Sequence, residues 1–216
     1  KTVKDVKNKI NELDSLEVDF LKAYEMLTPE QFKEVTKLAK EKGLKVTGHV
    51  PLSMDVIGSS NAGLNSMEHF RNLELSCASN SDELLLERQQ LLASGKEDKG
   101  GVLRSRIHKK QREVALQNFN EGKADEVLEV LKKNDTWQIP TLTLNTAFVK
   151  RPFAAKDWQE SFSYLPKNIQ EQWLNSINNR LKSQVKPFDK KYAKWMFDMT
   201  KRVHEKKIKI MAGTDT

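Results

Sequence analysis

Helical and strand-like patterns alternate through the first seventy residues of the chain, and this alternation restricts the fold more than any other feature. Apolar spacing predicts helices over residues 3–14, 28–43 and 51–63, and strands at 18–24, 45–49 and 66–69. The second helix has the clearest start, because Thr28 is a capping residue, Pro29 suits the first turn and Gln31 follows three residues after the cap. Short loops between such elements are typical of parallel βαβ units, so we predict an α/β fold.

Two long segments in the rest of the chain interrupt this alternation of helices and strands. Polar, mostly helical sequence covers residues 79–122, which we interpret as a helical insertion or lid, and a stretch broken by prolines covers residues 150–187. Regular elements are predicted around them: a helix at 123–133, a strand at 137–144, a helix at 189–206 and a last strand at 208–212. We expect residues 1–216 to belong to one barrel-like domain that carries the insertion.

The composition excludes several classes of protein. The chain has no run of about 18 apolar residues, so no membrane-spanning helix is predicted. Cys77 is the sole cysteine, which excludes an internal disulfide and a cysteine-rich zinc site. The net charge is +7, but the lysines are scattered among glutamates without interleaved aromatic residues, which favours solvated outer helices over nucleic-acid binding. The first residues show no signal-peptide pattern, and the compartment stays open.

Polar side chains with metal-binding chemistry stand at the ends of three predicted strands. His49 and His69 end the second and third strands, and Asp215 follows the last one. The carboxyl ends of the strands in an α/β barrel share one rim, so these residues can converge despite their separation in sequence. Nitrogen and oxygen donors of this kind suit a divalent metal, and zinc is the first expectation.

Lys22 is the unusual residue of the first predicted strand. Alternation places Leu21 and Ala23 toward the outer helices and Lys22 toward the interior. An ammonium group is costly to bury without a partner. Two explanations are open: Lys22 forms a salt bridge with a carboxylate such as Glu68, or its amine is modified to an acid and serves as a metal ligand.

Several segments, in order, carry a resemblance to a known family: Asp19–Tyr24, Gly48–Pro51, Ser66–His69 and Ala212–Thr216. Together they resemble the amidohydrolase superfamily, closest to its imidazolonepropionase-like and Xaa-Pro dipeptidase-like metal-dependent hydrolases. The resemblance implies a partial TIM (β/α)8 barrel, strands four to eight, with the insertion between strands six and seven. It also implies a carboxylated Lys22 that bridges two metal ions, and His49 and His69 as ligands of one of them. Asp215 would bind the other ion and act as the general base.

The same resemblance implies a reaction. Metal-activated water would hydrolyse a C–N bond in a small-molecule substrate, either a dipeptide, an amide or a cyclic amide. The family's His-x-His pair on the first barrel strand has no counterpart in this sequence. We therefore expect the C-terminal part of such an enzyme, inactive by itself and with weak or no metal binding. The alternative is a non-catalytic barrel fragment that binds ligands or self-associates, because an open half-barrel leaves strand edges unpaired.

The remaining histidines and the cysteine are expected to have structural roles. His108 lies in a basic helical stretch and is predicted to be solvated, with substrate contact from a lid as the alternative. His204 lies in the last turn of a helix, where a positive charge is favourable. Cys77 is predicted to be a packed or loop thiol, and the aromatic and methionine stripe of the helix at 189–206 is predicted to pack in the core.

Overall fold

The computed structural model describes residues 2–95 and 98–215, which form two compact units. The first unit comprises Lys1–Pro140 together with Val203–Met211, and the second comprises Thr141–Arg202 together with Ala212–Thr216. The barrel domain predicted over 1–216 and the insertion predicted over 79–122 both include positions outside the described residues. Their boundaries stay predictions.

Within the described residues, the first unit contains a sheet of four parallel strands. In sequence order they are β1 Phe20–Ala23, β2 Lys45–Gly48, β3 Ser66–Glu68 and β4 Trp137–Ile139, and they lie side by side in that same order. Lys22 pairs with Thr47, and Thr47 pairs with Ser66, so polar positions of neighbouring strands fall in one row. The last predicted strand is reduced to an isolated parallel bridge between Ile210 and Gln138. The predicted α/β fold is confirmed, whereas the numbering of these strands within a barrel stays a prediction.

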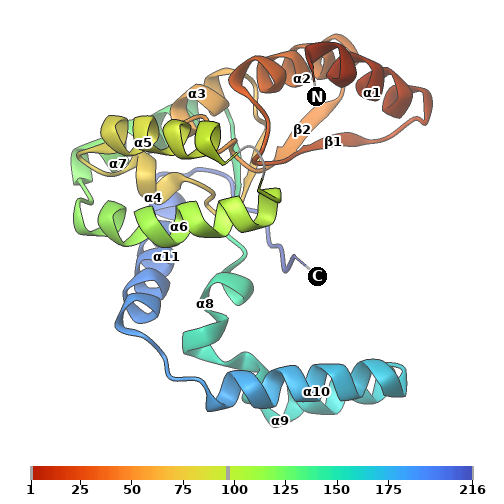
Figure 1. Cartoon of the computed structure of the whole chain (residues 1–216), viewed down its shortest axis with the longest axis vertical. Helices are drawn as coiled ribbons and strands as arrows, with labels where there is room; N and C mark the ends of the chain where they lie inside the picture. The colour runs from red at the N-terminus through yellow and green to blue at the C-terminus, as the bar shows by residue number, and fades with distance from the viewer. Residues whose placement is uncertain (1, 96–97, 216) are drawn as a thin grey trace. The chain divides into compact units, whose positions relative to one another are not determined.

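The two faces of the sheet differ in burial. The helices of this layer are α1 Val3–Ser15, α2 Pro29–Glu41, α3 Val56–Asn61 and α7 Glu121–Lys133. Helix α2 packs against β1 and β2, α1 packs against α2, and α3 packs against α7 (Figure 1). Leu21 and Met67 are buried, whereas Lys22 and Glu68, at alternate positions of the same strands, are more accessible. The side of the sheet that carries Lys22 and Glu68, called here the polar side, is therefore the accessible one, where a functional site can form.

Helix α2 begins as the sequence predicts. Oγ1 of Thr28 accepts a hydrogen bond from the backbone amide of Gln31 at 3.2 Å, and Oε1 of Gln31 accepts one from the Thr28 amide at 3.0 Å. The helix predicted over residues 51–63 is shorter than expected. It starts only at Val56, because the side chain of Asp55 provides the cap.

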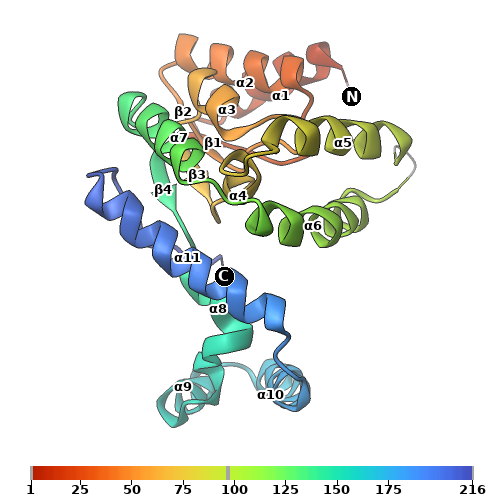
Figure 2. The same cartoon turned by 90° about the vertical axis from the view of Figure 1, so that its left-hand side faces the viewer.

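The segment after β3 forms a group of helices that belongs to the first unit. These are α4 Leu73–Ser76, α5 Ser81–Ser94 and α6 Gly100–Gln117. Helices α5 and α6 pack against each other, and α6 also packs against α4 (Figure 2). Leu103 and Ile107 of α6 share an apolar cluster with Leu52, which follows β2. The helical pair α5–α6 is therefore attached to the loop at the carboxyl end of β2.

The second unit is helical. It contains α8 Leu142–Lys150, η1 Pro152–Ala154, α9 Lys156–Glu160, η2 Ser161–Tyr164, α10 Lys167–Lys182 and most of α11 Pro187–Glu205. Its apolar core is formed by Ala147, Phe153, Phe162 and Ile177. The predicted burial of the stripe on α11 is confirmed for Trp195, Met196 and Met199. None of the described helices is long and apolar enough to cross a membrane.

The strand predicted over residues 137–144 is wrong beyond Ile139. Pro140 has no amide hydrogen to continue a ladder, and Thr141 takes a left-handed φ of 51°. Helix α8 starts at the next residue, Leu142. The alternating Thr-Leu pattern that favours a strand is therefore overridden by the backbone at Pro140 and Thr141.

Candidate metal centre

His49 is placed by a close approach between β1 and β2. Gly48 has a φ of 123°, and a Cβ at this position would lie 2.2 Å from the carbonyl oxygen of Ala23. Any other residue would push the two strands apart, so only glycine fits. The next amide, that of His49, donates to the same Ala23 oxygen at 3.0 Å. This contact fixes the histidine at the end of β2.

His69 lies in a turn with unusual backbone angles. His69, Phe70 and Asn72 have φ values of 62°, 51° and 67°. Left-handed angles are unfavourable for residues with side chains and persist only where the surroundings hold them, commonly at functional sites. Here the His69 amide donates to the oxygen of Ile139 at 2.6 Å, and Nδ2 of Asn72 donates to the oxygen of Pro51 at 3.0 Å. The turn is thus tied to β4 and to the loop after β2.

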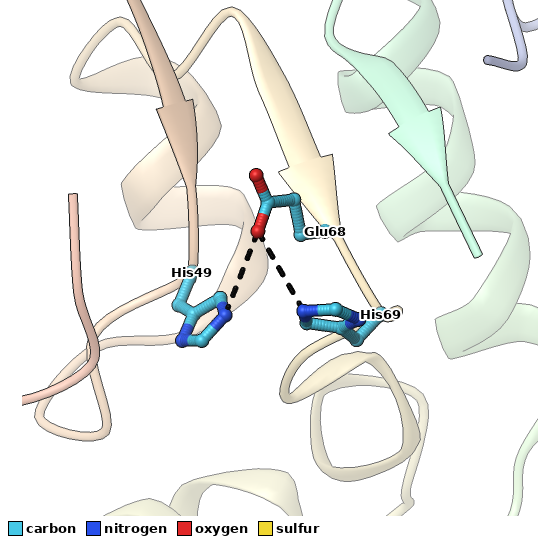
Figure 3. A group of neighbouring side chains, drawn as sticks. All are labelled: His49, Glu68 and His69. Atoms are coloured by element: carbon cyan, nitrogen blue, oxygen red, sulfur yellow. Dashed lines mark ion pairs between the residues drawn. The ribbon is translucent and has the colours of Figure 1, made fainter. Parts of the chain in front are cut away.

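Among the described residues, three side-chain donors converge at the ends of β2 and β3 (Figure 3). Nε2 of His49 and Nε2 of His69 each lie 3.6 Å from Oε2 of Glu68. Two imidazoles and a carboxylate are common zinc ligands, and tetrahedral bonds of about 2.1 Å would separate such atoms by about 3.4 Å. The side chains of both histidines are only 5% exposed, and that of Glu68 is 13% exposed. These residues therefore fit one divalent ion.

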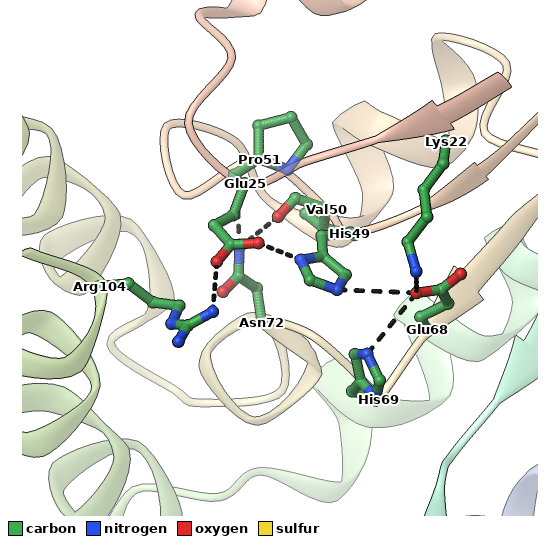
Figure 4. Close-up of polar contacts among 9 residues, drawn as sticks. All are labelled: Lys22, Glu25, His49, Val50, Pro51, Glu68, His69, Asn72 and Arg104. Carbon is green, nitrogen blue, oxygen red and sulfur yellow. Dashed lines mark hydrogen bonds and ion pairs between the residues drawn. The ribbon is translucent and has the colours of Figure 1, made fainter. Parts of the chain in front are cut away.

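Lys22 reaches the same carboxylate. Its Nζ lies 2.8 Å from Oε2 of Glu68, the oxygen that also faces both histidines (Figure 4). Of the two explanations that the sequence leaves open for Lys22, the structure contains the salt bridge. Carboxylation of its amine stays a prediction.

Glu25 lies on the other side of His49. Its Oε2 is hydrogen-bonded to Nδ1 of His49, and its Oε1 accepts from Nη1 of Arg104 at 2.9 Å (Figure 4). Burial raises the pKa of the Glu25 carboxyl, but the hydrogen bonds from His49 and Arg104 and the charges of His49 and Arg71 outweigh burial and lower this pKa to about 2. Glu25 is therefore a carboxylate, and the histidine is held between two acidic side chains.

The predicted site residues are divided between the two units. Lys22, His49 and His69 lie together in the first unit, whereas Asp215 belongs to the second. Asp215 has a left-handed φ of 61° and is exposed. Its role as ligand and general base stays a prediction.

The sequence indicates Glu68 only as a partner of Lys22 and does not indicate Glu25. Alternation in β3 is a signal for Glu68, because Ser66 and Glu68 share the face opposite the buried Met67. No local pattern identifies Glu25, because it lies beyond β1 and its partner His49 is distant in sequence.

The predicted solvation of His108 is wrong. This residue of α6 is only 8% exposed, and its Nε2 is buried with no hydrogen-bond partner among the described residues. Burial, together with the charges of Arg112, Arg71, Arg88 and Arg104, lowers the pKa of the His108 imidazole far below its ordinary value of 6.5. The prediction fails because the basic residues next to His108 in sequence suggest an exposed helix, whereas one side of α6 is buried.

Comparison with known proteins gives a fold relationship. No protein-family model matches the sequence, and no curated protein matches it significantly. Among solved structures, a bottromycin amidohydrolase matches over 100% of this chain with a TM-score of 0.58 and 14% sequence identity. The chain shares the amidohydrolase fold. The predicted resemblance is thereby confirmed at the level of the fold.

The chain spans 41% of the length of that amidohydrolase. Two further structures match over 100% of this chain. A Xaa-Pro dipeptidase with methionine bound in its active site has a TM-score of 0.48 at 14% identity, with 39% of its length covered. The ochratoxinase of A. niger has a TM-score of 0.49 at 15% identity, with 35% of its length covered.

Proposed function

We propose that this chain is the C-terminal part of a metal-dependent amidohydrolase barrel, strands four to eight, which hydrolyses C–N bonds in small molecules. The observation that carries the proposal is the convergence of two imidazole nitrogens and one carboxylate oxygen within 4.8 Å at the carboxyl ends of β2 and β3. Active sites of α/β barrels are built at that end of the strands. Dipeptides, amides and cyclic amides are the proposed substrates.

Each residue has a proposed task. His49 and His69 would hold a divalent ion, with zinc the first choice for these donors. Glu68 would be the acidic ligand of this ion, and a carboxylated Lys22 would bridge it to a second ion. A bound ion of this kind polarises a carbonyl group and lowers the pKa of water. Asp215 would accept the proton of the attacking water and pass it to the leaving amine.

The proposal is tested on the full-length protein reconstituted with zinc. We expect about two ions per chain and hydrolysis of at least one member of a panel of dipeptides, N-acyl amino acids and lactams. His69→Ala should remove most of the turnover, and the matched control His204→Ala should leave turnover intact, because His204 is exposed at the end of α11. Unchanged turnover in His69→Ala would exclude His69 as an essential ligand.

A non-catalytic, self-associating module is the second candidate. Phe20 and Tyr24, which extend along the polar side of β1, are each 55% exposed. Large exposed apolar groups on a sheet edge favour association with another chain. Absence of hydrolysis across the substrate panel, together with concentration-dependent association, would favour this candidate over the enzyme.

A further inference from the structure

His49 has a carboxylate partner on each of its two ring nitrogens (Figure 4). Nδ1 is hydrogen-bonded to Glu25, and the side chains of both residues are only 5% exposed. A carboxylate can only accept a hydrogen bond, so Glu25 holds a proton on Nδ1. The lone pair of a neutral His49 is then on Nε2, the nitrogen that lies 3.6 Å from Oε2 of Glu68. Glu25 therefore selects the tautomer that can bind a metal.

The other oxygen of Glu25 is held by the helical pair α5–α6. Nη1 of Arg104, from α6, donates to Oε1 of Glu25 at 2.9 Å. Arg106 lies on the same helix but pairs with Asp98 instead, at 2.8 Å. The two arginines, two positions apart, thus bind different carboxylates. Arg104 reaches the surroundings of His49, and Arg106 pairs within the α5–α6 segment.

A second arginine of the pair supports the loop that follows His49. Arg88 of α5 is fully buried, and its Nη1 donates to Oδ1 of Asn72 at 2.6 Å. Nδ2 of Asn72 in turn donates to the carbonyl oxygens of Val50 at 3.3 Å and Pro51 at 3.0 Å. The helical pair therefore reaches His49 by two routes: through Glu25 to its ring, and through Asn72 to the backbone after it.

We propose that Glu25 is the positioning residue of His49, and that the helical pair α5–α6, acting through Arg104, is a structural part of the metal centre rather than a lid over it. The proposal deepens the proposed function and rests on the donor group His49, Glu68 and His69. Carboxylates that orient metal-binding histidines commonly change metal affinity by about 10- to 100-fold when removed.

The tautomer of His49 gives a test that needs no metal. In the metal-free, ¹⁵N-histidine-labelled chain, at a pH where the imidazole is neutral, NMR should find the His49 proton on Nδ1. Glu25→Ala should move this proton to Nε2, whereas Glu25→Gln should keep it on Nδ1, because the amide oxygen can still accept. A native His49 that carries its proton on Nε2, or an unchanged tautomer in Glu25→Ala, would overturn the proposal.

Zinc affinity tests the contribution of α6. Arg104→Ala should weaken zinc binding about tenfold, and the matched variant Arg106→Ala should bind zinc like the native chain, with circular dichroism used to verify that both variants fold. Equal affinities in the two variants would contradict the role of Arg104. Absence of zinc from the reconstituted full-length protein would contradict the proposed function, whereas the NMR comparison needs no metal and decides the role of Glu25 separately.

Discussion

At the scale of single residues, the metal centre depends on one glycine that carries no functional group. Gly48 combines a φ of 123° with a position where a Cβ would meet the Ala23 carbonyl oxygen at 2.2 Å. Both the backbone angle and the close contact occur at the residue directly before His49. A glycine is therefore required before the histidine. It allows β1 and β2 to lie close together, and this close contact fixes the position of His49.

We expect Gly48→Ala to lower the free energy of unfolding by more than about 2 kcal/mol, because strain and steric overlap add at this position. Urea denaturation of the native chain and the variant measures the difference in the free energy of unfolding. The matched control is Gly101→Ala, because Gly101 lies in α6 and a Cβ added there would meet no atom within 4 Å. That control should be neutral or stabilising by up to about 1 kcal/mol. Equal effects of the two substitutions would contradict the role given to Gly48.

The sequence points to His49, His69 and Lys22 as candidate ligands but not to the side chains that surround them. His49 and His69 can be found because each ends a predicted strand, and Lys22 can be found because alternation turns it toward the interior. Glu25 and Arg104 cannot be found in this way, because their interaction joins the end of β1 to a helix 79 positions later. Contacts of that kind depend on the tertiary path of the chain, which local patterns do not contain.

At the scale of elements, α6 has a buried side that its basic sequence does not predict. His108 is buried, and this burial is the main factor that opposes protonation of its imidazole. The positive charges of nearby arginines, with Arg112 the strongest, oppose it further. In the unfolded chain the same imidazole takes up a proton below its ordinary pKa of 6.5. The unfolded state therefore binds more protons than the folded state as the pH falls below 6.5.

This difference makes stability depend on pH. The folded pKa of His108 is lowered, so the native chain should lose stability as the pH falls from 6.5 to 5, by up to about 1.4 kcal/mol per pH unit from this residue. His108→Leu should remove that part of the slope in denaturant titrations at several pH values. His204→Ala, at an exposed position, should keep the native slope. A slope unaffected by His108→Leu would show that His108 is protonated in the folded chain.

The elements differ in how far the sequence determines them. The start of α2 is predictable because Thr28 and Gln31 form a cap from neighbouring residues. The end of β4 is not, because the Thr-Leu alternation after Pro140 is compatible with a strand, and the change to a helix also depends on the φ of 51° at Thr141. Local hydrogen bonds can be inferred from residue types, whereas a single backbone angle cannot.

At the scale of the whole molecule, one edge of the described sheet carries exposed apolar side chains. β1 is at one edge of the strand order, and Phe20 and Tyr24 at this edge are each 55% exposed. The sequence predicts the parallel sheet but not the division of the chain into two units, because that division follows from contacts made far from the motifs. An exposed apolar edge predicts association between copies of the chain.

We expect the chain to self-associate with increasing concentration, measured by analytical ultracentrifugation. Phe20→Lys should shift the chain toward monomer, because a charge on an edge strand opposes pairing. Tyr164→Lys is the matched control, since Tyr164 is exposed but lies in the second unit. A monomeric native chain at all concentrations would contradict this expectation.

Zinc titration of the chain by calorimetry is the decisive measurement for the site formed by His49, Glu68 and His69. We expect weak binding of one ion per chain, lost in both His49→Ala and His69→Ala and retained in His204→Ala. Zinc binding that is equally strong in the native chain and in His69→Ala would contradict the proposed site.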